Sequence, residues 1–183
     1  MTMPGTHSSL AASPWVQRWS HLVSAHGAVL DVACGSGRHM RWFASRGHTV
    51  TGVDRSAELI ATAAALGEAV VADIENGPWP FEGRRFDAVV VTNYLWRPLM
   101  PVLLASLQPG GVLIYETFAA GNETVGKPSR PDFLLQPGEL LAACTCLHVV
   151  AYEDGFLPSP DRFVQRIAAV ANRSGEPQSR YAL

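Results

Sequence analysis

Cysteine is scarce in this sequence of 183 residues, occurring only at Cys34, Cys144 and Cys146. An odd count with one Cys-x-Cys pair provides neither a disulfide framework nor a zinc-ligand spacing. The six histidines form no His-x-x-x-His pair, so the sequence supports no metal site. We therefore expect reduced thiols and no metal. His39 and His48 have no carboxylate at a readable spacing and are expected at the surface or at helix ends.

Long hydrophobic runs and clusters of basic residues are also missing. No apolar run reaches the roughly 20 residues of a membrane-spanning helix, and residues 1–13 lack the basic and apolar regions of a signal peptide. The formal net charge of -2 offers no electrostatic surface for nucleic acid. We expect a cytoplasmic protein, monomeric or homodimeric, that binds neither membranes nor nucleic acids.

Short β-branched runs alternate with helical stretches along the chain, a pattern typical of α/β proteins with a Rossmann-like, mostly parallel sheet and helices on both faces. The length suits one domain, expected over residues 1–171, with 1–13 flexible and 172–183 a disordered tail. Seven strands are predicted, over residues 28–33, 48–54, 69–72, 87–92, 112–116, 147–152 and 163–170. Helices are predicted over residues 14–25, 38–46, 57–66, 98–107 and 137–143.

Two connections stand out by their lengths. Residues 153–162 are too few for a parallel crossover, so the last two strands should pair antiparallel. The segment from Phe118 to Gln136 is longer than loops usually are in compact domains, which predicts a substrate lid or binding loop.

The helix over 14–25 carries Trp15 and Trp19 on one face; we expect it to pack on the sheet, and it could also cover a ligand cleft.

Glycine and polar residues follow four of the predicted strands. The loop from Cys34 to Gly37 ends the first strand, while Asp54, Asp73 and Asn93 end the next three. The carboxyl ends of parallel strands form the ligand crevice of such sheets. Glycines let backbone N–H groups approach a ligand, and an acidic residue about 20 residues further on can accept ribose hydroxyls. This spacing predicts a nucleoside site.

The ligand is further restricted by a missing glycine. A dinucleotide site has the pattern Gly-x-Gly-x-x-Gly, but Gly35 and Gly37 are followed by His39 and Met40 with no third glycine. Asp31, inside the crevice end of the first strand, suits an amino group instead. A nicotinamide-dependent oxidoreductase is thereby disfavoured but stays an alternative.

The segment from Val29 to Gly37 resembles motif I of the class I S-adenosylmethionine-dependent methyltransferases, whose sheet has seven strands with an antiparallel last strand. The resemblance implies S-adenosyl-L-methionine as cofactor and S-adenosyl-L-homocysteine as product. It places Asp31 and the glycine loop at the methionine end, Asp54 at the ribose, and Asp73 with Ile74 at the adenine. Ala33 departs from the family's usual first glycine. The predicted cofactor residues are Asp31, Ala33, Cys34, Gly35, Gly37, Asp54, Arg55, Asp73, Ile74 and Asn93.

The stretches from Asn93 to Pro98 and from Tyr115 to Phe118 are similar to small bacterial methyltransferases of the tellurite-resistance type. This resemblance assigns no acceptor by itself. Our leading hypothesis is a small-molecule acceptor, with Tyr94, Tyr115, Asn122 and Arg130 as candidate substrate residues. Methyl transfer mainly needs alignment and exclusion of water, so no catalytic base is predicted. An RNA or protein methyltransferase acting with a partner, and a non-catalytic S-adenosylmethionine-binding module, remain open.

Overall fold

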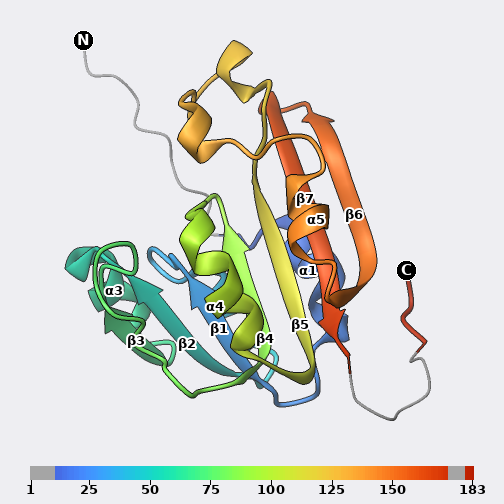
Figure 1. The fold of residues 1–183 in the computed structure, drawn as a ribbon. Helices are drawn as coiled ribbons and strands as arrows, with labels where there is room; N and C mark the ends of the chain where they lie inside the picture. The colour runs from blue at the N-terminus through green and yellow to red at the C-terminus, as the bar shows by residue number, and fades with distance from the viewer. Residues whose placement is uncertain (1–10, 173–179) are drawn as a thin grey trace.

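A seven-stranded sheet in the order β3-β2-β1-β4-β5-β7-β6 forms the centre of the molecule (Figure 1). The computed structural model describes residues 11–172 and 180–183. The first five strands run parallel, and β7 is antiparallel to both of its neighbours. The strands are β1 (Ala28–Val32), β2 (Thr49–Asp54), β3 (Glu68–Val71), β4 (Phe86–Thr92), β5 (Leu107–Phe118), β6 (Leu147–Leu157) and β7 (Arg162–Ala171). The predicted fold class and the antiparallel final pair are confirmed.

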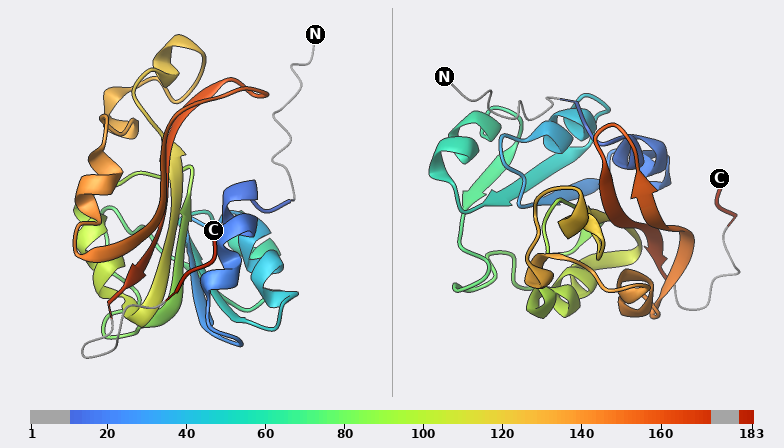
Figure 2. Two further views of the ribbon diagram at one scale, coloured as in Figure 1. Left: turned by 90° about the vertical axis from the view of Figure 1, so that its right-hand side faces the viewer. Right: turned by 90° about the horizontal axis from the view of Figure 1, so that it is seen from above.

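Helices cover both faces of this sheet (Figure 2). One layer contains α1 (Pro14–Trp19), α2 (Arg38–Ala44) and α3 (Ala57–Ala63); the other contains α4 (Met100–Ala105) and α5 (Glu139–Ala143). Short 3₁₀ helices join them: η1 (Ser20–Leu22), η2 (Arg97–Leu99), η3 (Asn122–Thr124) and η4 (Pro131–Phe133).

The two faces of the sheet carry separate hydrophobic cores because strand side chains alternate in direction. Leu30 and Val32 of β1 join the core under α4 and α5, whereas Val29 joins the core under α1 and α2. Asp31 is paired with Gly52 of β2, and by the same alternation it faces the α2 layer. A carboxylate thus lies under the first turn of α2.

The N-terminal helix is shorter than predicted and packs on the sheet. It ends at Trp19, not near residue 25, because η1 follows it directly. Trp15 and Trp19 are buried in the core, and the Trp15 indole Nε1–H donates to the Ile167 carbonyl of β7 at 3.2 Å. The prediction that these tryptophans are core residues is confirmed.

Residues at the two chain ends were predicted to be flexible, and residues 1–10 and 173–179 of those segments lie outside the described residues. The last four residues contact the body of the domain. Tyr181 stacks on His148 of β6 with ring centroids 5.3 Å apart, and the Ala182 carbonyl lies 3.2 Å from His21 Nε2. Within the described part of the chain, no helix has the length and apolarity needed to cross a membrane.

Candidate functional site

The loop between β1 and α2 makes its turn through left-handed backbone conformations. The φ angles are 53° at Ala33, 55° at Gly35 and 81° at Gly37. Glycine adopts this region without a steric penalty, whereas Ala33 carries a Cβ there and is strained. The Gly37 N–H donates to the Cys34 carbonyl at 3.0 Å, which closes the turn.

Asp54, at the end of β2, is held by two backbone amides. Its Oδ2 accepts from the Gly35 N–H at 2.9 Å and its Oδ1 accepts from the Ser56 N–H at 2.9 Å. A carboxylate has about four acceptor positions, so two remain for a ligand. The carboxylate is therefore oriented before any ligand arrives.

A pocket of about 500 Å³ opens at the carboxyl ends of the strands, a volume typical of small-molecule sites. One wall comes from the strand ends: Ala33, Asp54, Arg55, Ala72, Asp73, Ile74, Glu75, Asn93, Tyr94, Leu95, Thr117 and Phe118. The opposite wall comes from Pro128 and Phe133 of the long segment after β5. Seven of the predicted site residues thus meet here: Ala33, Asp54, Arg55, Asp73, Ile74, Asn93 and Tyr94.

The other predicted cofactor residues do not line the pocket: Asp31 lies in β1, and Cys34, Gly35 and Gly37 form the turn beside it. Cys34 is buried, and burial, assisted by the nearby carboxylates of Asp31 and Asp54, raises the pKa of its thiol far above the usual range. A protonated, buried thiol packs as a small apolar group. Its part in the loop is therefore packing.

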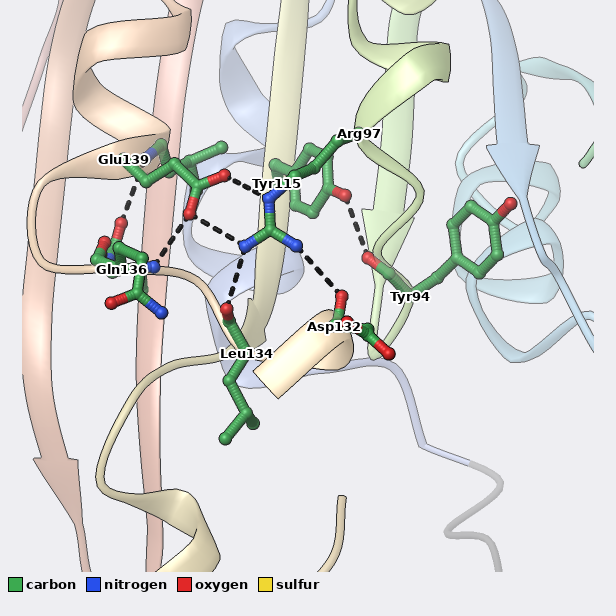
Figure 3. A network of polar contacts seen from close by, with 9 residues as sticks. Tyr94, Arg97, Tyr115, Asp132, Leu134, Gln136 and Glu139 are labelled. Carbon is green, nitrogen blue, oxygen red and sulfur yellow. Dashed lines mark hydrogen bonds and ion pairs between the residues drawn. The ribbon is translucent and has the colours of Figure 1, made fainter. Parts of the chain in front are cut away.

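Three predicted substrate residues lie elsewhere. Tyr115 is buried, with its side chain in the core under α4 and α5. Its hydroxyl donates to the Tyr94 carbonyl at 2.8 Å (Figure 3). Tyr115 therefore supports the pocket from behind and does not line it.

The side chains of Asn122 and Arg130 hold the long segment in place and do not face the pocket. The buried Asn122 amide donates to the Pro128 carbonyl at 2.9 Å and accepts from the Phe163 N–H at 3.2 Å. Arg130 is exposed and pairs with Asp132 at 2.7 Å. Neither side chain reaches the pocket wall.

Asp73 has two roles: its carboxylate closes a local turn, and the residue lines the pocket. Its carboxylate accepts from the Asn76 side-chain amide at 2.9 Å and from the backbone N–H groups of Glu75 and Asn76 at 3.0 and 3.2 Å. These hydrogen bonds, that of the Asn76 side chain first, lower the pKa of Asp73. The residue is a local cap and also an exposed anion at the pocket.

Tyr94 brings a polar group into the pocket wall. Its hydroxyl oxygen is buried and has no hydrogen-bond partner among the described residues. Burial, followed by the negative charge of Glu75, raises the pKa of this phenol well above its ordinary value. The hydroxyl is therefore neutral, with Glu75 as its main charged neighbour.

His39 lies at the N-terminal end of α2, one of the two positions expected for it, but its side chain is buried. It is 2% exposed, as is Asp31, and its Nδ1 lies 3.7 Å from Asp31 Oδ1. Its Nε2 lies 3.3 Å from the Ser13 N–H, which donates to it. The surface alternative was wrong because this end of α2 packs against Asp31 of β1. The apolar spacing of Met40 and Phe43 was the available signal that this helix packs closely.

Asp31 keeps one acceptor unused. Its Oδ2 is buried and has no hydrogen-bond partner among the described residues. A buried carboxylate oxygen without a partner is costly. A positively charged ligand group would remove that cost.

The N-terminal segment is tied to this region by a second buried carboxylate. The Ser13 hydroxyl donates to Glu116 Oε1 at 2.8 Å, and Arg166 Nη1 lies 3.4 Å from Glu116 Oε2. Arg166 also pairs with Glu153 of β6 at 2.7 Å. Residues from both ends of the domain thus meet at the carboxyl edge of β5.

Arg97, just after β4, joins the long segment to the sheet. Its guanidinium forms a bidentate ion pair with Glu139 at 2.6 and 2.9 Å (Figure 3). It also donates to the carbonyls of Asp132 and Leu134, each at 2.9 Å. The hydrogen bond from Arg97 holds the pKa of the Glu139 carboxyl below its usual range.

Among the described residues, no cluster of three or more potential metal ligands occurs.

Known proteins resemble this chain in both sequence and fold. Residues 29–111 match the family model described as a methyltransferase domain. A malonyl-(acyl-carrier protein) O-methyltransferase of Pectobacterium atrosepticum is 33% identical over 120 residues, which cover 58% of this chain and 45% of that protein. The chain spans less than half the length of the curated relatives that it matches.

Solved structures share the fold at low sequence identity. TehB from Haemophilus influenzae superposes with a TM-score of 0.76 at 18% identity, over 91% of this chain and 64% of TehB. An S-adenosylmethionine-dependent methyltransferase from Mesorhizobium loti gives a TM-score of 0.67 at 18% identity, over 88% of this chain and all of that one. The resemblance to methyltransferases is confirmed in sequence over residues 29–111 and in fold by TehB and related structures.

Proposed function

We propose that this chain is a class I S-adenosylmethionine-dependent methyltransferase that methylates a small-molecule acceptor in the pocket under the segment from Phe118 to Gln136. The match of residues 29–111 to a methyltransferase domain and the shared fold support this proposal. The main support for the proposal is the second wall of the pocket. Pro128 and Phe133 come from this chain's own segment and face the strand ends across a space of about 500 Å³. A pocket roofed in this way suits a compact acceptor.

The residues present fit the cofactor. The orphaned Asp31 Oδ2 offers a partner to an ammonium group, and the oriented Asp54 carboxylate offers acceptors to ribose hydroxyls. Asp73 and Ile74 lie further along the same pocket, where the adenine is proposed to bind. When bound, S-adenosylmethionine supplies an electrophilic methyl carbon on a sulfonium.

The acceptor is assigned to the part of the pocket nearest the long segment. Its walls there are Leu95, Phe118, Pro128 and Phe133. These groups can align a small nucleophile and keep water away, which is the main demand of methyl transfer.

The curated relatives suggest one specific class of acceptor. Those proteins are named for O-methylation of a malonyl group, which makes a carboxylate oxygen the second candidate beside thiols and chalcogen oxyanions. Arg55 is the one guanidinium in the pocket wall.

The proposal is tested with purified protein and S-adenosylmethionine carrying a labelled methyl group. Separate reactions contain an alkyl thiol, tellurite, selenite, a malonyl thioester, bulk tRNA and a denatured protein extract. We expect label in one of the small molecules, and S-adenosylhomocysteine released in equal amount. Asp54→Ala serves as the cofactor-site control, and Asp87→Ala as the matched neutral control, because Asp87 binds the Ala28 N–H at 2.8 Å at the opposite end of β1.

Two outcomes would overturn the proposal. Label confined to tRNA or protein would assign a macromolecular substrate. S-adenosylhomocysteine binding without transfer to any acceptor would indicate a non-catalytic binding module.

A further inference from the structure

Phe133 is held at the pocket by hydrogen bonds to the residues on either side of it. Arg97 Nη1 donates to the Asp132 carbonyl and Nη2 to the Leu134 carbonyl, both at 2.9 Å (Figure 3). The same guanidinium is fixed by Glu139 through Nε and Nη2. One side chain thus connects the end of β4, η4 and α5.

The local structure around Phe133 is weak by itself. The helix η4 spans three residues, with single backbone bonds from Phe133 to Arg130 and from Leu134 to Pro131. Short 3₁₀ turns have poor hydrogen-bond geometry. The conformation of this segment therefore depends on contacts with the rest of the molecule.

The far end of the segment is anchored separately. The Gln136 N–H donates to Glu139 Oε2 at 2.7 Å, and the Gln136 carbonyl accepts from the Gln165 side chain of β7 at 2.6 Å. Gln165 also accepts from the Leu140 N–H at 3.0 Å. Between the two ends, the Leu135 N–H donates to the Phe118 carbonyl at 3.0 Å and the Leu135 carbonyl accepts from the Ala120 N–H at 2.9 Å. Arg97 is the side chain that joins the η4 end to Glu139.

Phe133 is exposed and lines the pocket at the same time. It is 41% exposed and lies in the wall opposite the strand ends, one of which is Phe118. Arg130 stands 5.3 Å from the ring centroid. An exposed aromatic surface at a pocket is a place where an apolar ligand gains binding energy.

We propose that Arg97 is a positioning residue that holds Phe133 as the acceptor-facing wall of the pocket, where the ring contacts the apolar part of a small acceptor. This inference rests on the proposed small-molecule function and adds to it the chemical character of the acceptor. Only a planar fork can serve Glu139 and two carbonyls together. Lysine at position 97 retains the charge and loses that geometry.

The first test needs no acceptor. Hydrogen exchange is measured by mass spectrometry on the full chain with S-adenosylhomocysteine bound. In Arg97→Gln, exchange in peptides covering residues 131–136 should rise about tenfold or more while exchange in β4 and β5 is unchanged, since local opening depends on local contacts. Arg97→Lys should be intermediate.

Arg84→Gln is the matched control. Arg84 forms a bidentate pair with Glu68 at 2.9 and 2.8 Å, with side chains 45% and 48% exposed, outside the pocket wall. This variant should leave exchange over 131–136 unchanged. Unchanged exchange in Arg97→Gln, or an equal rise across the whole sheet, overturns the positioning role.

The second test uses the small molecule that is methylated most rapidly in the acceptor screen. Arg97→Gln and Phe133→Ala should each raise its KM about tenfold, with the S-adenosylhomocysteine Kd unchanged, and Phe133→Leu should retain most of the affinity. A fall in kcat with unchanged KM overturns the acceptor-wall role. Failure of the acceptor screen contradicts the proposed function, whereas the exchange result decides the role of Arg97 in either case.

Discussion

The carboxylate of Asp54 accepts a 2.9 Å hydrogen bond from the backbone N–H of Gly35, so the end of β2 holds the loop that follows β1. The same carboxylate lines the pocket. Loop geometry and ligand contact are thereby combined in one side chain. Substitutions at position 54 should affect both.

Asp54→Ala should weaken S-adenosylhomocysteine binding about tenfold or more, equivalent to ~1.4 kcal/mol, because charge-assisted hydrogen bonds are lost. Isothermal titration calorimetry measures the Kd. Asp87→Ala removes a comparable carboxylate-to-amide bond remote from the pocket and should leave the Kd unchanged. Equal affinity in Asp54→Ala and the natural protein contradicts the assignment.

Ser13→Ala should destabilise the protein more than Ser56→Ala. Both serines cap a helix, accepting from the Trp15 and Leu59 N–H groups, and a lost cap costs about 1 kcal/mol. Ser13 also donates to the buried Glu116, and leaving that acceptor unpaired brings the expected loss to about 2–3 kcal/mol. Urea unfolding measures both variants, and equal losses would argue against the Glu116 bond.

Gly52→Ala should disturb the packing between β2 and the glycine loop. A Cβ at position 52 would collide with Met40 Sδ and lie 2.8 Å from Cys34 Sγ. Overpacking of this kind costs about 1–3 kcal/mol, and the displaced Cys34 should weaken S-adenosylhomocysteine binding. Gly155→Ala, in β6 with no atom within 4 Å of the added Cβ, should change neither thermal stability nor Kd. Matching behaviour of the two variants would contradict this packing argument.

Only one of the three cysteines should react with a thiol reagent in the native protein at pH 8. Cys146 is exposed, whereas burial raises the pKa of Cys144 to about 12 and that of Cys34 further, and the thiolate is the reactive form. Ellman's reagent should count one thiol natively and three after denaturation, with Cys146→Ser reducing the native count to zero. Two or more native thiols would contradict the burial of Cys34 or Cys144.

The same two thiols predict a direction for stability against pH. The folded protein retains their protons to higher pH than the unfolded chain, whose thiols ionise near pH 9.0. The unfolded state therefore binds fewer protons above that pH, and the free energy of unfolding should fall as pH rises beyond about 9. Replacing Cys144 by alanine should reduce this slope in urea unfolding curves measured from pH 8 to 10.

Much of the fold could be predicted because its signals are local. The left-handed turn needs glycine at positions 35 and 37, and the short link between β6 and β7 permits only antiparallel pairing. The polar residues that end β2, β3 and β4 meet in one pocket because parallel strands end at one edge of a sheet.

Side-chain partners depend on packing and could not be predicted in this way. Tyr115 was expected at the substrate, but the register of β5 turns it into the core. His39 and Asp31 are brought together by the angle at which α2 lies on β1. Neither the register nor that angle is encoded in a short sequence pattern.

The sequence by itself determined the glycine loop, the order of strands and helices and the acidic strand end at Asp54, since turn chemistry and hydrophobic period act over a few residues. Only the tertiary structure decided that Ser13 meets Glu116 across 103 residues and Arg97 meets Glu139 across 42. Contacts at such separations follow from how the layers pack on the sheet, and this packing is settled by the whole chain.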